Sequence, residues 1–351
     1  MYNMRYIKTS KRIDLLKDAA NENGWSIDVI GQTKNGLDLF VFRNKPDDRV
    51  DICAWSLMHG NEPTGFNALL SFMRRPGSLI SWSIFPIVNP NGADLFERLN
   101  AEAVDINRDA RNLNSFEGSA LSKWVLGEKP SLALNLHDQR TCFYPKGKEV
   151  PASFSLLAPK GNKDYETMSQ SIAMNCCSWM TNVLKRDFPE GVGKFDDSFY
   201  PSAFGEYFQE KNIPTITLET GIALNDWARV GVSNSLGELL FSLDKNFQSA
   251  LSCKLKLYNK LPENVNNAQD WICITSSGPY EIKIIESVED QKYSLTWKVI
   301  GPGELVRKHW FFSESVSDSV KLMPGQILDN DLVRSLGGNC INDLDVFNFS
   351  D

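Results

Sequence analysis

The sequence lacks the features that mark several large classes of protein. Its 351 residues contain no run rich in lysine and arginine, and the formal net charge is −7 at pH 7. Because surfaces that bind nucleic acid are strongly basic, this balance argues against a nucleic-acid partner. No apolar run approaches the length that spans a bilayer, and the first twelve residues have no apolar core of signal-peptide length. We therefore expect a cytoplasmic protein that acts without a membrane.

Cysteine and histidine are both scarce. The seven cysteines are odd in number and show no CxxC spacing. We interpret them as reduced thiols in a reducing compartment and not as a disulfide framework. Only three histidines are present, at positions 59, 137 and 309. The surroundings of each one are therefore informative.

The most informative stretch joins a buried strand to a helix. Residues 51–58 form a nearly continuous apolar run, as in a strand buried on both faces of a parallel sheet. The run ends in His59-Gly-Asn-Glu62, and Pro63 suits the first turn of a helix. His59 and Glu62 should lie at the carboxyl end of that strand, where open α/β sheets bind ligands. Zinc binds this pair of side chains, although a helix-capping Glu beside a hydrogen-bonded His would give the same pattern.

Three further apolar strands also end at polar side chains. The strands predicted over 78–88, 132–136 and 213–218 are followed by Asn89, His137 and Glu219. Because parallel strands bring their carboxyl ends to one edge of a sheet, these side chains should share a cleft. Their joint occurrence favours a catalytic zinc site, in which three protein ligands leave a fourth position to water. His309 lies outside this pattern and is expected to be structural or exposed.

The predicted fold class is α/β, with a mixed, mostly parallel sheet that has helices on both faces. Helices are predicted over about 11–23, 63–73, 115–126, 164–186, 203–211 and 233–250. After about Lys254 the sequence changes to short β-like runs separated by Gly, Pro, Ser and Asp. We therefore predict a catalytic domain over 1–254 and a small β-rich domain over 255–351.

These motifs resemble the zinc carboxypeptidase family, of which carboxypeptidase A is the familiar member. The resemblance covers roughly residues 20–250, and the order and separation of the motifs agree. The matching pieces are residues 31–36, 59–62, 89–92, 98, 105–108, 136–137 and 218–219. The final β domain is similar instead to the aspartoacylase and succinylglutamate desuccinylase branch. That branch also carries His-Gly-Asn-Glu and Asp-x-Asn-Arg motifs and a carboxyl-terminal β domain.

The resemblance implies a metal centre with a defined role for each residue. His59, Glu62 and His137 correspond to the three protein ligands of one zinc ion per chain. Glu219 corresponds to the general base that takes the proton of the zinc-bound water and returns it to the leaving amine. Asp105 corresponds to the carboxylate that orients the first histidine. The alternatives are that Glu219 pairs with a nearby arginine and that Asp105 caps its loop.

The resemblance also implies contacts to the substrate. Arg98 corresponds to the arginine that stabilises the oxyanion, and Asn107 with Arg108 to the pair that holds the free carboxylate. Tyr200 corresponds to the mobile tyrosine that closes over the substrate, after which Glu206 or Tyr207 could face the side-chain pocket. Without the resemblance, the two arginines would be interpreted as solvated and Tyr200 as a packed loop residue. Asp138 and Gln139 depart from the Ser or Gly that often follows the third ligand.

The sequence thus predicts a zinc-dependent metallocarboxypeptidase that hydrolyses the amide bond next to a free C-terminal carboxylate. The alternative with the same chemistry is an N-acyl amino-acid deacylase or a cell-wall-peptide amidase. A non-catalytic zinc-binding scaffold would be expected to lack the base, and Glu219 is present. The expected partner is a peptide or N-acyl amino-acid substrate that carries a free carboxylate.

Overall fold

The chain folds into two compact units. The first consists of Met1–Arg140 and Pro145–Asn264, and the second of Thr141–Tyr144 and Val265–Asp351. The computed structural model describes residues 6–148, 150–196, 198–223, 226, 228–265, 271–275, 278–289, 291–302 and 323–328. His309 lies outside the described residues.

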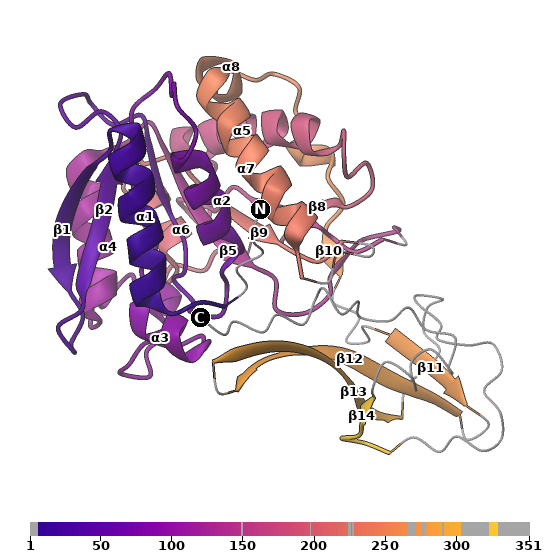
Figure 1. Ribbon diagram of the computed structural model, residues 1–351. Coiled ribbons are helices and arrows are strands. Elements are labelled where there is room, and N and C mark those ends of the chain that lie inside the picture. The colour runs from indigo at the N-terminus through magenta and orange to yellow at the C-terminus, as the bar shows by residue number, and fades with distance from the viewer. Residues whose placement is uncertain are drawn as a thin grey trace. The chain divides into compact units, whose positions relative to one another are not determined.

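The first unit is built on an eight-stranded mixed sheet (Figure 1). The strand order is β1 (Ser26–Gln32), β2 (Asp38–Arg43), β4 (Trp82–Phe85), β3 (Ile52–Trp55), β5 (Leu132–Asp138), β9 (Thr215–Thr220), β7 (Phe154–Leu157) and β8 (Val192–Lys194). The four central strands, from β4 to β9, run parallel to one another, and β7 pairs in parallel with β8. The pairs β1–β2, β2–β4 and β7–β9 are antiparallel. The predicted mixed, mostly parallel sheet is confirmed.

Helices cover both faces of this sheet (Figure 1). One face packs against α1 (Thr9–Asn23), α2 (Thr64–Met73), α5 (Met168–Leu184) and α7 (Val230–Lys245). The other face packs against α4 (Phe116–Glu128) and α6 (Phe204–Glu210). The short elements are α3 (Pro90–Leu95), α8 (Phe247–Leu251), the 3₁₀ helices Ile106–Arg108 and Tyr258–Lys260, and the paired strands β6 (Tyr144–Pro145) and β10 (Asn264–Val265).

Burial on both faces explains the unbroken apolar run of β3. Ile52 and Ala54 point into the core beneath α2, whereas Cys53 and Trp55 point into the core beneath α4 and α6. All four residues are fully buried. Neither face of β3 therefore meets water, and polar residues are excluded until the strand ends.

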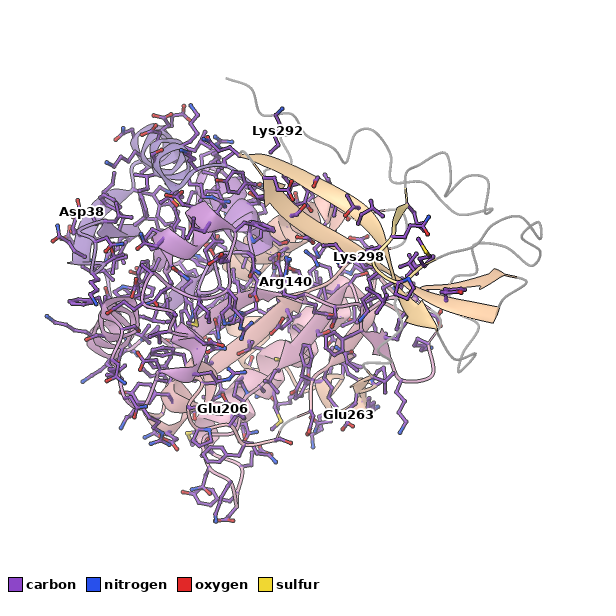
Figure 2. The ribbon with its side chains drawn as sticks, turned by 90° about the horizontal axis from the view of Figure 1, so that it is seen from below. Asp38, Arg140, Glu206, Glu263, Lys292 and Lys298 are labelled. Carbon is purple, nitrogen blue, oxygen red and sulfur yellow. The ribbon has the colours of Figure 1, made fainter. Side chains whose placement is uncertain are left out.

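The second unit contains a four-stranded antiparallel sheet. Its strands are β11 (Trp271–Thr275), β12 (Gly278–Glu289), β13 (Lys292–Pro302) and β14 (Ile327–Leu328). The β12–β13 hairpin is the longest pairing, with Lys292 beside its turn and Lys298 farther along β13 (Figure 2). The predicted β-rich character of the carboxyl-terminal region is confirmed. Among the described residues, no helix combines the length and the hydropathy that crossing a membrane requires.

The turn between β3 and α2 has no room for a side chain at Gly60. A Cβ there would lie 1.9 Å from the carbonyl carbon of Gly92 and 2.2 Å from the backbone nitrogen of Ala93. Because backbone atoms cannot move aside as a flexible side chain does, Gly60→Ala should lower the free energy of unfolding by at least about 2 kcal/mol. Urea denaturation measures this change.

Gly127 supplies the matched control for this substitution. It lies in α4, and a Cβ there would meet no heavy atom within 4 Å. Gly127→Ala should leave stability unchanged or raise it by up to about 1 kcal/mol, since alanine is the better helix former. Equal stability of the two variants would contradict the close approach of the Gly92–Ala93 backbone to Gly60.

Candidate metal centre

The loop between β3 and α2 positions His59 and Glu62. The backbone of this loop is held by the segment after β4, because Val88 N donates to Ser56 O and Asn89 N to Leu57 O at 3.2 and 2.9 Å. Glu62 N then donates to His59 O at 3.1 Å, which closes a tight turn. Both side chains are buried. The turn thus holds an imidazole and a carboxylate side by side at the edge of the sheet.

His137 joins this pair from the neighbouring strand β5. The Glu62 carboxylate lies between the two imidazoles, with Oε1 2.8 Å from His59 Nδ1 and Oε2 2.7 Å from His137 Nδ1. One ligand atom from each of the three residues lies within 4.8 Å of the others, and no other group of this kind occurs in the described part of the chain. Two imidazole nitrogens and a carboxylate oxygen that converge in a buried site fit a divalent cation such as zinc.

Burial and charge compete in setting the protonation of this cluster. Burial opposes charge on His59, but the carboxylates of Glu62 and Asp105 raise its pKa to about 9. Burial also opposes charge on Glu62, yet the two histidines hold the pKa of Glu62 well below its usual value. The pKa of His137 is lowered, chiefly by burial. The cluster therefore keeps an ionised carboxylate in a buried place, where a cation would neutralise it.

Asp105 holds the far side of the His59 ring. Its Oδ1 lies 3.0 Å from His59 Nε2 and accepts the backbone N–H of Asn107 at 3.0 Å. Asp105 therefore offers an acceptor for a proton on Nε2, and Nδ1, which faces Glu62 Oε1 at 2.8 Å, is the nitrogen that would bind a metal. Burial alone would raise the pKa of Asp105, but the contacts to His59 and Arg98 keep it below its usual range.

Arg98 reaches the cluster through the same carboxylate. Its Nε and Nη2 lie 3.0 and 2.9 Å from Asp105 Oδ2. Its Nη1 lies 3.2 Å from His59 Nδ1 and 3.5 Å from Glu62 Oε1. The side chain is 40% exposed. A fixed guanidinium therefore lies beside the ligand atoms and is still open to solvent.

Glu219 lies next to His137 on the adjacent strand. The parallel pairing of β5 with β9 places His137 directly opposite Glu219. The Glu219 side chain is partly buried. Burial, and then the charge of Glu62, raise the pKa of Glu219 to about 8. A carboxyl group with a raised affinity for protons thus stands beside the candidate metal centre.

Asn107, Arg108 and Tyr200 lie together on the approach to this centre. Asn107 Oδ1 accepts the backbone N–H of Phe204 at 3.1 Å, and its Nδ2 lies 3.5 Å from His137 Nε2. The Arg108 guanidinium lies 4.6 Å from the centroid of the Tyr200 ring, and Tyr200 is 51% exposed. The structure thus places Asn107 beside His137, Arg108 against the backbone O of Asn107, and Tyr200 against Arg108.

Sequence reasoning did not find the residues that contact Asp138 and so support the candidate metal centre. Thr64, Thr220 and Arg229 contact Asp138, which lies directly after His137. In the sequence, Thr64 is 74 residues from Asp138 and Thr220 is 82 residues from it. No local pattern marks such distant contacts, and the only available signal was the unusual acidic residue after His137.

Comparison with known proteins identifies the fold of the chain but no family. No family model and no curated protein matches the chain. Among solved structures, a metallo-carboxypeptidase from Pseudomonas aeruginosa is 14% identical with a TM-score of 0.56, over 70% of each chain. Carboxypeptidase A from Helicoverpa armigera is 16% identical with a TM-score of 0.55, over 71% of this chain and 74% of that one.

A third structure, a metallo-carboxypeptidase from Burkholderia cenocepacia, is 11% identical with a TM-score of 0.53, over 69% of this chain and 70% of that one. At such low identities the likeness concerns the fold alone. The chain has the carboxypeptidase A-like fold, as its sequence motifs predicted. Its structural neighbours are metallopeptidases, and its His-Glu-His cluster is of the kind that binds a metal.

Glu206 is a buried carboxyl group close to Arg108 and Tyr200. It lies in the first turn of α6 (Figure 2). Burial raises its pKa from the ordinary 4.5 to about 7, although the backbone of Tyr200 and the charge of Arg108 favour the ionised form. The folded state therefore keeps the proton at a pH where the unfolded chain has lost it, so stability falls as the pH rises from about 4.5 to 7.

Glu206→Gln cannot ionise and should escape this loss. We expect the stability of the variant minus that of the wild type to increase from pH 5 to pH 8 by up to about 2.5 kcal/mol, measured by urea unfolding at each pH. The control is Glu238→Gln, because the pKa of Glu238 is lowered by its hydrogen bond with Arg75 and this carboxylate stays ionised throughout that range. A difference that does not change with pH for Glu206→Gln would contradict the burial of this carboxyl group.

Proposed function

We propose that the chain is a zinc-dependent metallocarboxypeptidase that hydrolyses the amide bond next to a free C-terminal carboxylate. One observation carries the proposal: His59, Glu62 and His137 converge in a buried cluster, with Glu219 opposite His137 on the next strand. The metallo-carboxypeptidase from P. aeruginosa is in complex with (2-guanidinoethylmercapto)succinic acid. That ligand carries carboxylates, which supports a substrate class with the same group.

The reaction would divide between the metal and Glu219. Zinc at the cluster would supply a Lewis acid that polarises the scissile carbonyl and lowers the pKa of water. Glu219 would accept the proton of the attacking water and later return it to the leaving amine. Its position opposite His137 supports this role, because a carboxylate there lies beside the candidate metal centre.

Arg98 would stabilise the oxygen that becomes negative when water attacks the carbonyl. Two of its nitrogens are held by Asp105, so the guanidinium is fixed before the substrate binds. Its Nη1 is then left beside His59 Nδ1. A fixed cation at the place where negative charge develops contributes more than a mobile one, since no reorganisation is needed during the reaction.

Asn107 and Arg108 would hold the free carboxylate of the substrate. A guanidinium can donate two parallel hydrogen bonds to a carboxylate. The Arg108 guanidinium packs against the ring of Tyr200, and the exposure of Tyr200 makes this ring accessible to a bound substrate. This arrangement supports cleavage at the carboxyl end of the substrate.

The first test concerns the base. Glu219→Gln keeps the shape of the side chain but cannot accept a proton, so turnover of a free-acid peptide should fall by about a hundredfold or more. Because Glu219 is not among the three candidate ligands, the variant should still bind about one zinc per chain. Steady-state kinetics and elemental analysis measure these two results.

Glu238→Gln, on the surface beside Arg75, is the control for the same chemical change. It should match the wild type in turnover and in zinc content. Normal turnover in Glu219→Gln would remove this residue from the reaction. Loss of zinc in that variant would place Glu219 among the ligands instead.

The second test concerns the carboxylate. A guanidinium binds a carboxylate through two charge-assisted hydrogen bonds, which a neutral amide cannot replace. Peptides with a free C-terminus should be cleaved, and their C-terminally amidated forms should be nearly inert. Arg108→Ala should weaken transition-state binding of the free acids by about 2–4 kcal/mol, while barely changing the amidated peptides.

Arg75→Ala, which removes a surface arginine, is the control and should preserve the preference for free acids. If free-acid and amidated substrates are cleaved equally well, the role of Arg108 is wrong and an amidase becomes the better interpretation. If only short N-acyl amino acids are cleaved, the enzyme is a deacylase that uses the same site.

A further inference from the structure

Asp138 is a buried carboxylate at the meeting point of several segments. Its side chain has no exposed surface. Its Oδ2 accepts the hydroxyl of Thr64 at 2.8 Å and lies 3.6 Å from Nη1 of Arg229. Its Oδ1 accepts the hydroxyl of Thr220 at 2.7 Å, and the same hydroxyl lies 3.2 Å from the backbone O of His137. One side chain on β5 therefore contacts the start of α2, the end of β9 and the residue before α7.

Each threonine partner of Asp138 lies within two residues of a group in the candidate site. Thr64 is two residues after Glu62, and Thr220 directly follows Glu219. Asp138 itself directly follows His137, and its backbone N–H donates to Glu62 Oε2 at 3.2 Å. Displacement of Asp138 would thus move two candidate metal ligands and the candidate base relative to one another.

Arg229 is the positively charged partner of Asp138 in this network. It is buried, its backbone adopts a left-handed φ of 56°, and its Nη2 donates to Gln139 O at 2.6 Å. A buried ion pair is costly to desolvate, and well-packed apolar residues are often as stable. The presence of such a pair next to the candidate metal centre is therefore better explained by the geometry that it imposes than by stability.

We propose that Asp138 is a positioning residue that sets the spacing between Glu62, His137 and Glu219. The proposal rests on the proposed function, because it assigns a role within that same site. The two threonine hydroxyls divide the network into a half on the side of Glu62 and a half on the side of Glu219. Removal of each hydroxyl should therefore have a different consequence.

Thr64→Val and Thr220→Val test the two halves separately. Valine has nearly the shape of threonine and leaves the charge of Asp138 unchanged, so altered function would come from position and not from lost charge. Thr64→Val should lower zinc affinity by about 10-fold to 100-fold, as other losses of groups that support metal ligands do. Thr220→Val should keep zinc affinity within about threefold and lower kcat/KM at saturating zinc by about tenfold or more, since Glu219 is not a ligand.

Thr215→Val is the matched control. Thr215 is a buried threonine at the other end of β9, and its hydroxyl donates to Ile213 O at 2.9 Å. It should preserve both zinc affinity and kcat/KM. Asp138→Asn should lower both quantities, and the threonine variants keep the proposal testable if that protein does not fold.

The experiment measures zinc affinity by competition with a chelating dye, and kcat/KM on a free-acid peptide, using the full-length chain. The proposal is supported if Thr64→Val loses affinity while Thr220→Val loses turnover alone. It is overturned if both variants match Thr215→Val in both measurements, even if they unfold at lower urea concentration. A wild-type chain that binds zinc and cleaves peptide in that case keeps the proposed function intact. A wild-type chain that does neither overturns the proposed function and this inference with it.

Discussion

The site depends on one buried carboxylate. Glu62 lies between the imidazoles of His59 and His137, with Oε1 2.8 Å from His59 Nδ1 and Oε2 2.7 Å from His137 Nδ1. An ionised carboxylate inside a protein must be paired and hydrogen-bonded, or it changes its protonation. The surrounding structure meets this demand in layers: two histidines contact Glu62, Asp105 and Arg98 hold His59, and the backbone N–H of Asp138 donates to Glu62. A divalent cation fits the same demand, because its positive charge would neutralise the buried carboxylate.

The strand order explains how residues so far apart in the sequence meet. β3, β5 and β9 are neighbours in the sheet and run parallel. The loops and residues at their carboxyl ends therefore meet at one edge. His137 and Glu62 are 75 residues apart, and the register of β5 with β9 then fixes Glu219 opposite His137. The turn that carries His59 and Glu62 is held in place by the tight backbone packing at Gly60. Chemistry and fold are thus set by the same contacts.

Features coded in short stretches of sequence could be predicted, and features coded by distant contacts could not. The apolar runs gave the central strands, and the motifs gave the cluster that the structure brings together. Residues 89–92 have the composition of a turn, but the Asn89 side chain accepts the N–H of Gly92 and starts the short helix α3. The helix predicted over 233–250 is divided at Asn246, which leaves helical geometry and bonds back to Ser242 O.

The contacts of Asp138 had no local signal, since both threonine partners lie far away in the chain. The domain boundary predicted at 254 and the roles of the site residues stay predictions.

The central claim is that His59, Glu62 and His137 hold one metal ion. X-ray absorption at the zinc edge, on the full chain loaded with one zinc, tests it most directly. The account predicts nitrogen and oxygen neighbours at about 2.0–2.2 Å, the scattering of two imidazoles, and no sulfur. In His137→Ala the imidazole scattering should fall to one ring. Sulfur next to the metal, or the same spectrum in wild type and His137→Ala, would contradict the account.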